Sequence, residues 1–117
     1  MTSEPVVLVV EDEEESRETL RELLEFEGHR VQVAINGKEA LDLLESMGAP
    51  PCIVLLDLLM PVMDGWKFLD RLRASGRLAT TKVVIMTSAP HRAPAGLPIL
   101  EKPLDVDKVM GLVDACC

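Results

Sequence analysis

The apolar positions of this chain form short continuous runs separated by segments with helical periodicity. Residues 6–10, 52–56 and 82–86 are almost wholly apolar, which is typical of strands covered on both faces of a sheet. Residues 30–34 alternate between polar and apolar positions, which predicts a strand nearer an edge. A short apolar run at 97–100 predicts a fifth strand.

The segments around these strands have apolar residues spaced to form one face of a helix. Acidic residues in the first turn, Gly28 as a C-cap and Asp105 as an N-cap support this interpretation. The helices are expected at about residues 14–27, after 36–37, around 66–72 and after 105. Because strands and helices alternate, the pattern predicts right-handed βαβ units and a parallel sheet.

Length and charge limit the possible classes of protein. The chain has 117 residues, which predicts a single domain spanning 1–117. A formal net charge of −8 argues against direct nucleic-acid binding, because the chain would repel phosphate backbones. No apolar run is long enough to cross a bilayer, and residues 1–4 lack the basic start of a signal peptide. We therefore expect a cytoplasmic domain with no membrane partner.

The cysteines give no metal or redox motif. Cys52, Cys116 and Cys117 are an odd, sparse set without metal-ligand spacing, which fits a reducing compartment. The adjacent Cys116 and Cys117 can pair with each other only through a strained bridge. A redox function is not predicted from this pattern.

Polar residues with complementary chemistry follow four of the predicted strands. Glu11 and Asp12 follow the first, Asp57 the third, Thr87 the fourth and Lys102 the fifth. In an open parallel sheet, ligands bind beyond the carboxyl ends of the strands. Polar residues are ordinary where a strand meets solvent, but three carboxylates, a hydroxyl and an ammonium at one edge predict a site.

These residues resemble the receiver (response regulator) domains of two-component signalling, and the resemblance covers essentially the whole chain. The 55–65 segment, with Asp57, Met-Pro and Asp-Gly, is the most specific part. The other matching pieces are Glu11-Asp12, Met86-Thr87-Ser88 and Lys102-Pro103. The resemblance implies a flavodoxin-like, doubly wound, five-stranded α/β sheet in the order 2-1-3-4-5.

The resemblance also implies that Asp57 accepts a phosphoryl group from a histidine kinase or phosphotransfer protein. A carboxylate can form an acyl phosphate, and Mg²⁺ or Mn²⁺ is the implied cofactor, because a hard cation relieves repulsion among acids and phosphoryl oxygens. By analogy, Asp12 and Asp57 bind the metal directly, Glu11 binds it directly or through water, and the Leu59 carbonyl completes the protein ligands. The domain would signal through phosphorylation-dependent contacts with another protein, catalysing only its own phosphoryl transfer and dephosphorylation, and so is not expected to be an enzyme.

Further roles follow from the same resemblance. Lys102 would pair with one phosphoryl oxygen, and the Thr87 hydroxyl would hydrogen-bond another. Backbone N–H groups of Leu58, Leu59 and Ser88 would supply additional donors.

Two departures from the family concern the acid pair and the phosphoryl lifetime. The first acid is Glu11, where many relatives have aspartate, so its charge is kept and its reach is altered. Leu59 and Ala89 lie two residues beyond Asp57 and Thr87, at positions that flank the attacking water in the family. Neither side chain can orient water, so we expect a long-lived phosphoryl group.

The largest departure is the segment between Thr87 and Lys102. Pro90, Pro94 and Pro98 remove backbone donors at every fourth position, which excludes a regular multi-turn helix. We expect a loop or a single turn, and four main helices instead of five. The aromatic switch residue of the family is replaced by Ile99, so output would use another face or an ordering of the Pro-rich loop.

Two alternatives remain open from the sequence. The shortened segment is compatible with a pseudo-receiver that binds a partner without phosphorylation. A phosphohydrolase with an aspartate nucleophile is a third class, although such enzymes usually place a second acid where Leu59 stands.

Overall fold

A computed structural model describes residues 5–117, and the sequence prediction for residues 1–4 therefore lies outside the described part. Five parallel strands form one sheet in the order β2-β1-β3-β4-β5, which confirms the predicted flavodoxin-like arrangement. The strands are β1 Val6–Val10, β2 Arg30–Ala34, β3 Ile53–Asp57, β4 Val83–Thr87 and β5 Ile99–Glu101.

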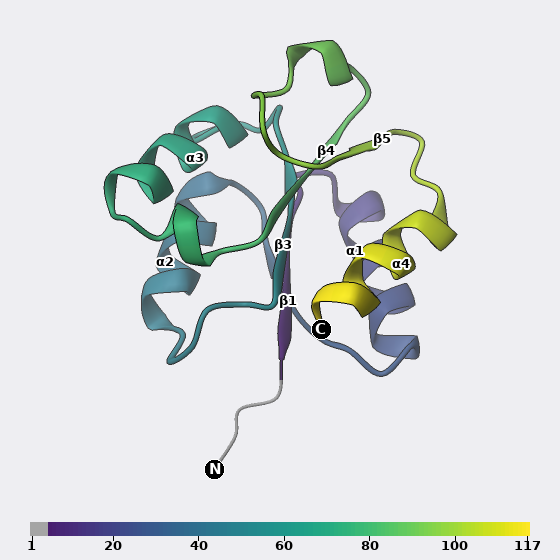
Figure 1. Ribbon diagram of the computed structural model, residues 1–117. Coiled ribbons are helices and arrows are strands. Elements are labelled where there is room, and N and C mark those ends of the chain that lie inside the picture. The colour runs from purple at the N-terminus through teal and green to yellow at the C-terminus, as the bar shows by residue number, and fades with distance from the viewer. Residues whose placement is uncertain (1–4) are drawn as a thin grey trace.

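Helices cover both faces of this sheet, with α1 and α4 on one face and α2 and α3 on the other (Figure 1). The helices are α1 Glu14–Phe26, α2 Gly37–Ser46, α3 Gly65–Ala74 and α4 Val106–Cys116, with short 3₁₀ turns at Leu78–Thr80 and Pro90–Arg92. Side-chain N-caps fix three of the helix starts. Asn36 accepts a hydrogen bond from Glu39 N at 2.8 Å, and Asp64 and Asp105 cap α3 and α4 in the same way.

Two apolar cores form because side chains alternate between the faces of each strand. Val7 and Val9 of β1 face the core under α1 and α4, whereas Leu8 and Val10 face the core under α2 and α3. β3 and β4 are buried along their whole length. This double burial explains why their sequences read as continuous apolar runs.

The strand boundaries differ slightly from the prediction. β3 and β4 lie one residue later than predicted, so that they begin at Ile53 and Val83 and end at Asp57 and Thr87. These two polar side chains therefore belong to the sheet itself. β5 begins at Ile99 and not at Leu97. Pro98 has no N–H to donate, but its carbonyl accepts from Ile85 N at 2.9 Å and joins the strand to β4.

The segment between β4 and β5 contains one 3₁₀ turn, Pro90–Arg92, which confirms the expected absence of a regular helix there. Ala93 and Leu97 of this segment pack against the core under α2 and α3, as does Trp66 of α3. The Arg92 guanidinium lies 6.0 Å from the centroid of the Trp66 ring. The segment is therefore docked on the body of the domain.

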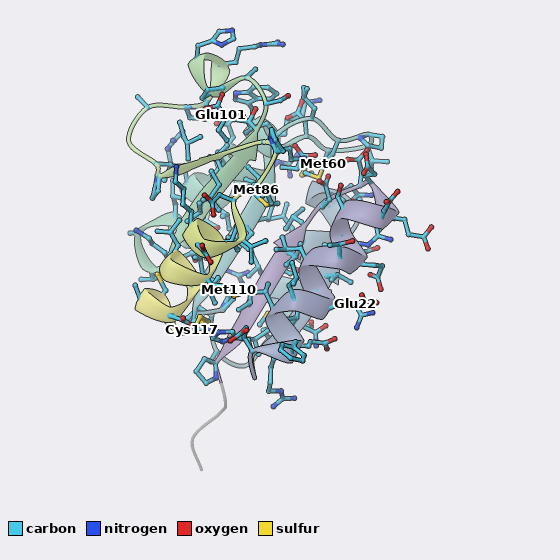
Figure 2. All side chains as sticks on the ribbon, turned by 90° about the vertical axis from the view of Figure 1, so that its right-hand side faces the viewer. Glu22, Met60, Met86, Glu101, Met110 and Cys117 are labelled. Carbon is cyan, nitrogen blue, oxygen red and sulfur yellow. A yellow bond between two sulfur atoms is a disulfide. The ribbon has the colours of Figure 1, made fainter. Side chains whose placement is uncertain are left out.

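A disulfide joins Cys52, just before β3, to Cys117, just after α4, with the Cα atoms 5.4 Å apart. Cys117 lies near the end of the molecule from which β1 begins (Figure 2). This pair was not predicted from the sequence, because 65 positions separate the two cysteines and only the fold brings them together. Among residues 5–117, no helix is long and apolar enough to cross a bilayer.

Candidate functional site

The polar side chains that follow the strands meet at one end of the sheet. Asp57 is the last residue of β3 and Thr87 the last residue of β4, while Glu11 directly follows β1 and Lys102 directly follows β5. All the strands are parallel, so their carboxyl ends share one edge. The structure thus brings together the groups that the sequence placed there.

Three carboxylates form the centre of this site. Ligand atoms of Glu11, Asp12 and Asp57 all lie within 4.8 Å of one another. Asp12 is exposed, whereas Glu11 is 3% exposed and Asp57 is 8% exposed. Such proximity is unfavourable for like charges in a partly desolvated place, so a positive charge would stabilise the cluster.

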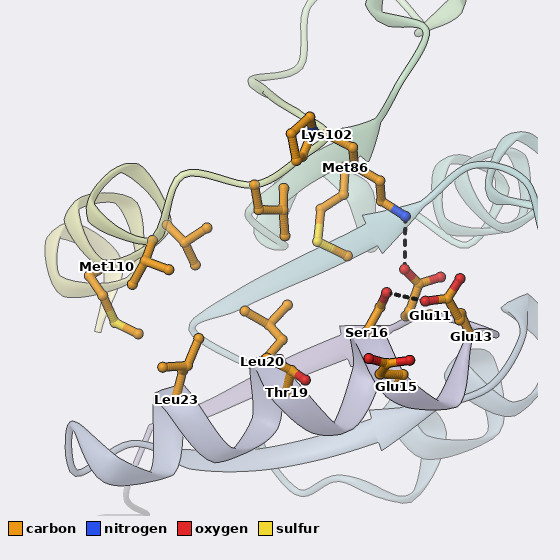
Figure 3. Close-up of a pocket in the computed structure, with 14 residues that line it drawn as sticks. Glu11, Glu13, Glu15, Ser16, Thr19, Leu20, Leu23, Met86, Lys102 and Met110 are labelled. Carbon is orange, nitrogen blue, oxygen red and sulfur yellow. Dashed lines mark hydrogen bonds and ion pairs between the residues drawn. The ribbon is translucent and has the colours of Figure 1, made fainter.

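Lys102 supplies one positive charge to the cluster. Its Nζ donates to Glu11 Oε1 at 2.8 Å and lies 3.7 Å from Asp57 Oδ2. Figure 3 shows the lysine reaching from the end of β5 toward Glu11. The backbone fixes this reach, because Lys102 N donates to Thr87 O at 2.8 Å.

The pKa of Glu11 is raised above its ordinary value of 4.5. Burial is the largest cause, and the adjacent Asp57 carboxylate adds to it, while Lys102 opposes both. For Lys102, burial acts to lower the pKa, but the hydrogen bond to Glu11 and the charge of Asp57 outweigh it and raise the pKa above 10.5. Lys102 therefore stays charged, whereas ionisation of Glu11 is less favourable than that of an ordinary glutamate.

The donor set suits a hard divalent cation. Mg²⁺ is bound in proteins by one or two carboxylates together with waters and phosphate oxygens. Glu11 Oε2 is buried without a hydrogen-bond partner, the one such side-chain atom within residues 5–117. A buried carboxylate oxygen without a partner is costly, and a cation held by Glu11, Asp12 and Asp57 would satisfy it.

The other predicted residues surround Asp57. Thr87 is buried, and its Oγ1 accepts from Ala89 N at 3.0 Å, so the hydroxyl proton remains to be donated. Leu59 N donates to Asp57 Oδ1 at 3.4 Å, while the Leu59 side chain is 57% exposed. Leu58 is buried and Ser88 is exposed, each next to a strand end that carries a site residue.

Two residues that were not predicted from the sequence to have a role also shape the site. Arg17 of α1 donates from Nη1 to the carbonyls of Glu11 and Asp12 at 3.2 and 3.3 Å and so holds the acidic turn. Gly65 begins α3 so close to the site that a Cβ there would lie 2.8 Å from Asp57 O. The Asp64-Gly65 pair in the sequence could have indicated the role of Gly65, whereas no pattern in the sequence indicated that of Arg17.

A mostly apolar pocket of about 410 Å³ opens beside the cluster, between α1 and α4. Leu20 and Leu23 of α1 face Met110 of α4 across it, and Met86 of β4 points toward it (Figure 3). Glu11 and Lys102 stand at its polar end. The pocket thus extends from the apolar sides of α1 and α4 to the carboxylate cluster.

Comparison with known proteins identifies the fold family. The family model described as "Response regulator receiver domain" matches residues 7–113. The chain belongs to this family. The receiver is 34% identical to the response regulator MprA of Mycolicibacterium vanbaalenii over 93% of its length and 48% of that protein. It is also 34% identical to the response regulator Rre1 of Synechocystis over 95% of its length and 51% of that protein. This chain therefore spans about half the length of these relatives.

Solved structures agree with this assignment. The receiver domain of the hybrid histidine kinase CckA is 30% identical, with a TM-score of 0.80 over 94% of this chain and 96% of that one. The response regulator TrrA of Thermotoga maritima, described in complex with Mg²⁺ and BeF, is 27% identical, with a TM-score of 0.81 over 97% of this chain and 99% of that one.

Proposed function

We propose that this receiver accepts a phosphoryl group on Asp57 from a phosphohistidine of a histidine kinase or phosphotransfer protein. The observation that carries the proposal is the position of Asp57, between two further carboxylates within 4.8 Å and the Lys102 ammonium at 3.7 Å. An aspartate with only a structural role at a strand end would not need two carboxylates and an ammonium beside it. The membership of the receiver family supports the same role.

The chain's own groups divide the chemistry among them. An Asp57 carboxylate oxygen attacks phosphorus, the phosphorus–nitrogen bond of the donor breaks, and the imidazole leaves with the electron pair. Lys102 pairs with a phosphoryl oxygen, and the Thr87 hydroxyl donates to another. The N–H groups of Leu58, Leu59 and Ser88 lie at the strand ends to add donors. Catalysis is then positioning and charge neutralisation.

A divalent cation completes this proposal. Glu11, Asp12, Asp57 and the Leu59 carbonyl would hold Mg²⁺ or Mn²⁺, in agreement with the unsatisfied Glu11 Oε2. When bound, the ion supplies the positive charge that lets phosphoryl oxygens approach the acids. The related T. maritima protein is described with Mg²⁺ and BeF, which supports this assignment.

The receiver would work as a signalling domain in the cytoplasm, where it meets its kinase. It would catalyse its own phosphorylation and dephosphorylation and pass the signal by protein contacts. The charge of −8 argues against nucleic acid as the direct partner of this domain.

Intact-mass measurement tests the proposal. The protein is incubated with acetyl phosphate and Mg²⁺, and then with acetyl phosphate and a chelator. We expect one phosphoryl adduct with Mg²⁺, a much weaker one with the chelator, and none for Asp57→Asn.

Asp64→Asn is the matched control for this experiment, because Asp64 lies in the same connection but caps α3 through Lys67 N at 2.9 Å. Asparagine also caps helices, so this variant should accept phosphate like the wild type. Absence of an adduct on the wild type would favour a pseudo-receiver, and continuous release of phosphate would favour a hydrolase.

A further inference from the structure

The disulfide between Cys52 and Cys117 lies at the end of the sheet opposite the carboxylate cluster. Cys52 precedes β3, whereas Asp57 is the last residue of β3. Cys117 follows α4, whereas Lys102 lies before its start. The bond therefore connects the far ends of two elements whose near ends adjoin the site, and it is separate from the phosphoryl chemistry.

Interactions other than the sulfur–sulfur bond hold the two backbones in place. Cys52 N donates to Val6 O at 2.9 Å, and Cys117 N donates to Val113 O at 2.8 Å. Val113 is fully buried against the sheet. His29 Nε2 also lies 3.1 Å from Asp114 Oδ1, which ties the end of α4 to the turn before β2. The Cα separation of 5.4 Å falls in the range that a disulfide spans, so the bond fits a backbone that these other interactions also hold in place.

Both redox forms suit this position. Cys52 Sγ lies 3.3 Å from the Val6 carbonyl oxygen, which can accept the S–H of the reduced form. Cys117 is exposed and Cys52 is half-buried, so a small thiol can reach the bond from the Cys117 side. An exposed disulfide sulfur is open to attack by a small thiolate, which is the first step of exchange.

The third cysteine does not compete for this pairing. Cys116 is unpaired and half-buried, and it packs against the core under α1 and α4. Cys116 is the last residue of α4, whereas Cys117 follows the helix and is exposed, so the two side chains lie in different surroundings. Cys116 thus provides a matched control at the neighbouring position.

We propose that Cys52 and Cys117 form a reversible redox pair that fastens the end of α4 to the sheet. A small disulfide such as oxidised glutathione is the oxidant: two protein thiols and one glutathione disulfide give one protein disulfide and two glutathione thiols. A mixed disulfide forms at Cys117, and the Cys52 thiolate then displaces the second glutathione thiolate. Excess small thiol reverses both steps.

Oxidation should strengthen the attachment of α4 and leave the carboxylate cluster unchanged. The bond closes a segment of sequence separation 65 and thereby restricts the unfolded chain. For a loop of this length, the melting temperature should rise by about 15 °C. Mg²⁺ affinity should be the same in both forms, because the acids lie at the other end of β3.

Alkylation and mass measurement test the proposal on the full chain. The protein is equilibrated with oxidised glutathione or with excess dithiothreitol, and free thiols are then blocked with iodoacetamide. We expect one blocked thiol, at Cys116, in the oxidised sample and three in the reduced sample, since the chain has three cysteines. Cys116→Ser should keep the protection and the rise in melting temperature, whereas Cys117→Ser should lose both.

Three blocked thiols after oxidation would overturn the proposal, as would pairing that requires Cys116 or joins two chains. Equal melting temperatures for the oxidised and reduced wild type would also overturn it. The test does not depend on phosphorylation, so its failure and that of the phosphoacceptor role are distinguishable. Cys117→Ser should fold normally because residue 117 is exposed and follows the last helix.

Discussion

At the scale of single residues, we expect Leu59 and Ala89 to flank the water that would attack phosphorylated Asp57. Leu59 is 57% exposed and Ala89 is half-buried, and neither offers a hydrogen-bonding side chain. Family resemblance places the attacking water between these two positions. An apolar pair there leaves the water without orientation.

Leu59→Asn should therefore hasten loss of the phosphoryl group several-fold. The amide supplies a donor and an acceptor beside Asp57, whose Oδ1 already accepts from Leu59 N at 3.4 Å. Decay of the adduct is followed by intact mass after removal of the phosphodonor. Ala89→Val is the apolar control and should not slow the decay further. Unchanged decay in Leu59→Asn would show that water orientation at residue 59 does not limit the rate.

Glu11 predicts a pH dependence for metal binding. Its pKa is raised above 4.5, by burial first and by Asp57 second, so the folded state favours the protonated form. The proton and Mg²⁺ compete for the same carboxylate. Mg²⁺ affinity should thus begin to fall at a pH higher than an ordinary glutamate would require, as pH decreases from 7 toward 4.5.

Calorimetric Mg²⁺ titrations of the wild type and Glu11→Gln measure this effect. The variant should bind Mg²⁺ more weakly at pH 7 and lose affinity less steeply as the pH falls. Parallel curves for the two proteins would show that Glu11 does not compete with protons for the ion.

At the scale of elements, the start of α3 is packed directly against the end of β3. Gly65 N donates to Leu58 O at 2.9 Å, and a Cβ on Gly65 would lie 2.8 Å from both Asp57 O and the Leu58 Cα. Only glycine allows this approach. The helix thereby fixes the backbone that presents Asp57.

Gly65→Ala should lower the free energy of unfolding by about 1–3 kcal/mol, because the backbone must move to admit the methyl group. Gly111→Ala in α4 is the control, since a Cβ there meets nothing within 4 Å, and better helix propensity should stabilise that variant by about 0.5–1 kcal/mol. Urea unfolding measures both. Equal stabilities of Gly65→Ala and wild type would mean that α3 shifts without cost.

The Pro-rich segment between β4 and β5 changes the usual arrangement of elements in a receiver. It keeps one 3₁₀ turn, and Ala93 and Leu97 pack against the same core as α2 and α3. Arg92 also lies over Trp66. Because this segment contacts α3 and directly follows Thr87, we expect any signal from the site to leave through it or through another face.

At the scale of the whole molecule, the carboxylate cluster that serves the proposed function should lower the stability of the metal-free fold. Three acids within 4.8 Å share one ammonium, which is unfavourable without a cation. Glu11 makes the free energy of unfolding depend on pH, because its pKa in the folded state is raised above 4.5. Its stabilising contribution is fully present below pH 4.5 and is lost as the pH rises through the higher pKa of the folded state. At pH 7 the metal-free fold bears this cost.

Asp57→Asn should accordingly raise the melting temperature in a chelator, by an amount that corresponds to about 1–2 kcal/mol. Mg²⁺ at about one hundred times its dissociation constant should stabilise the wild type by about 2.7 kcal/mol and Asp57→Asn by less. Differential scanning calorimetry with and without Mg²⁺ checks both expectations. A lower melting temperature for Asp57→Asn in chelator would show that the Asp57–Lys102 contact outweighs the repulsion.

Local patterns in the sequence were enough to predict the succession of strands and helices along the chain, the family, and the residues that meet at the carboxyl edge of the sheet. Apolar runs and helical periodicity are local consequences of burial, and Asp57, Thr87 and Lys102 each adjoin a strand. The absence of a regular helix between β4 and β5 could also be predicted locally, because prolines remove backbone donors. The ends of β3 and β4 were predicted one residue too early, because Asp57 and Thr87 take part in strand pairing despite their polar side chains.

Contacts between residues far apart in the chain became visible only in the folded molecule. The 2.8 Å bond from Lys102 to Glu11, the hold of Arg17 on the acidic turn and the pairing of Cys52 with Cys117 each join segments that no local pattern connects. The raised pKa of Glu11 likewise depends on burial by the whole fold. Such features depend on distances across the assembled sheet, which spacing along the chain does not record.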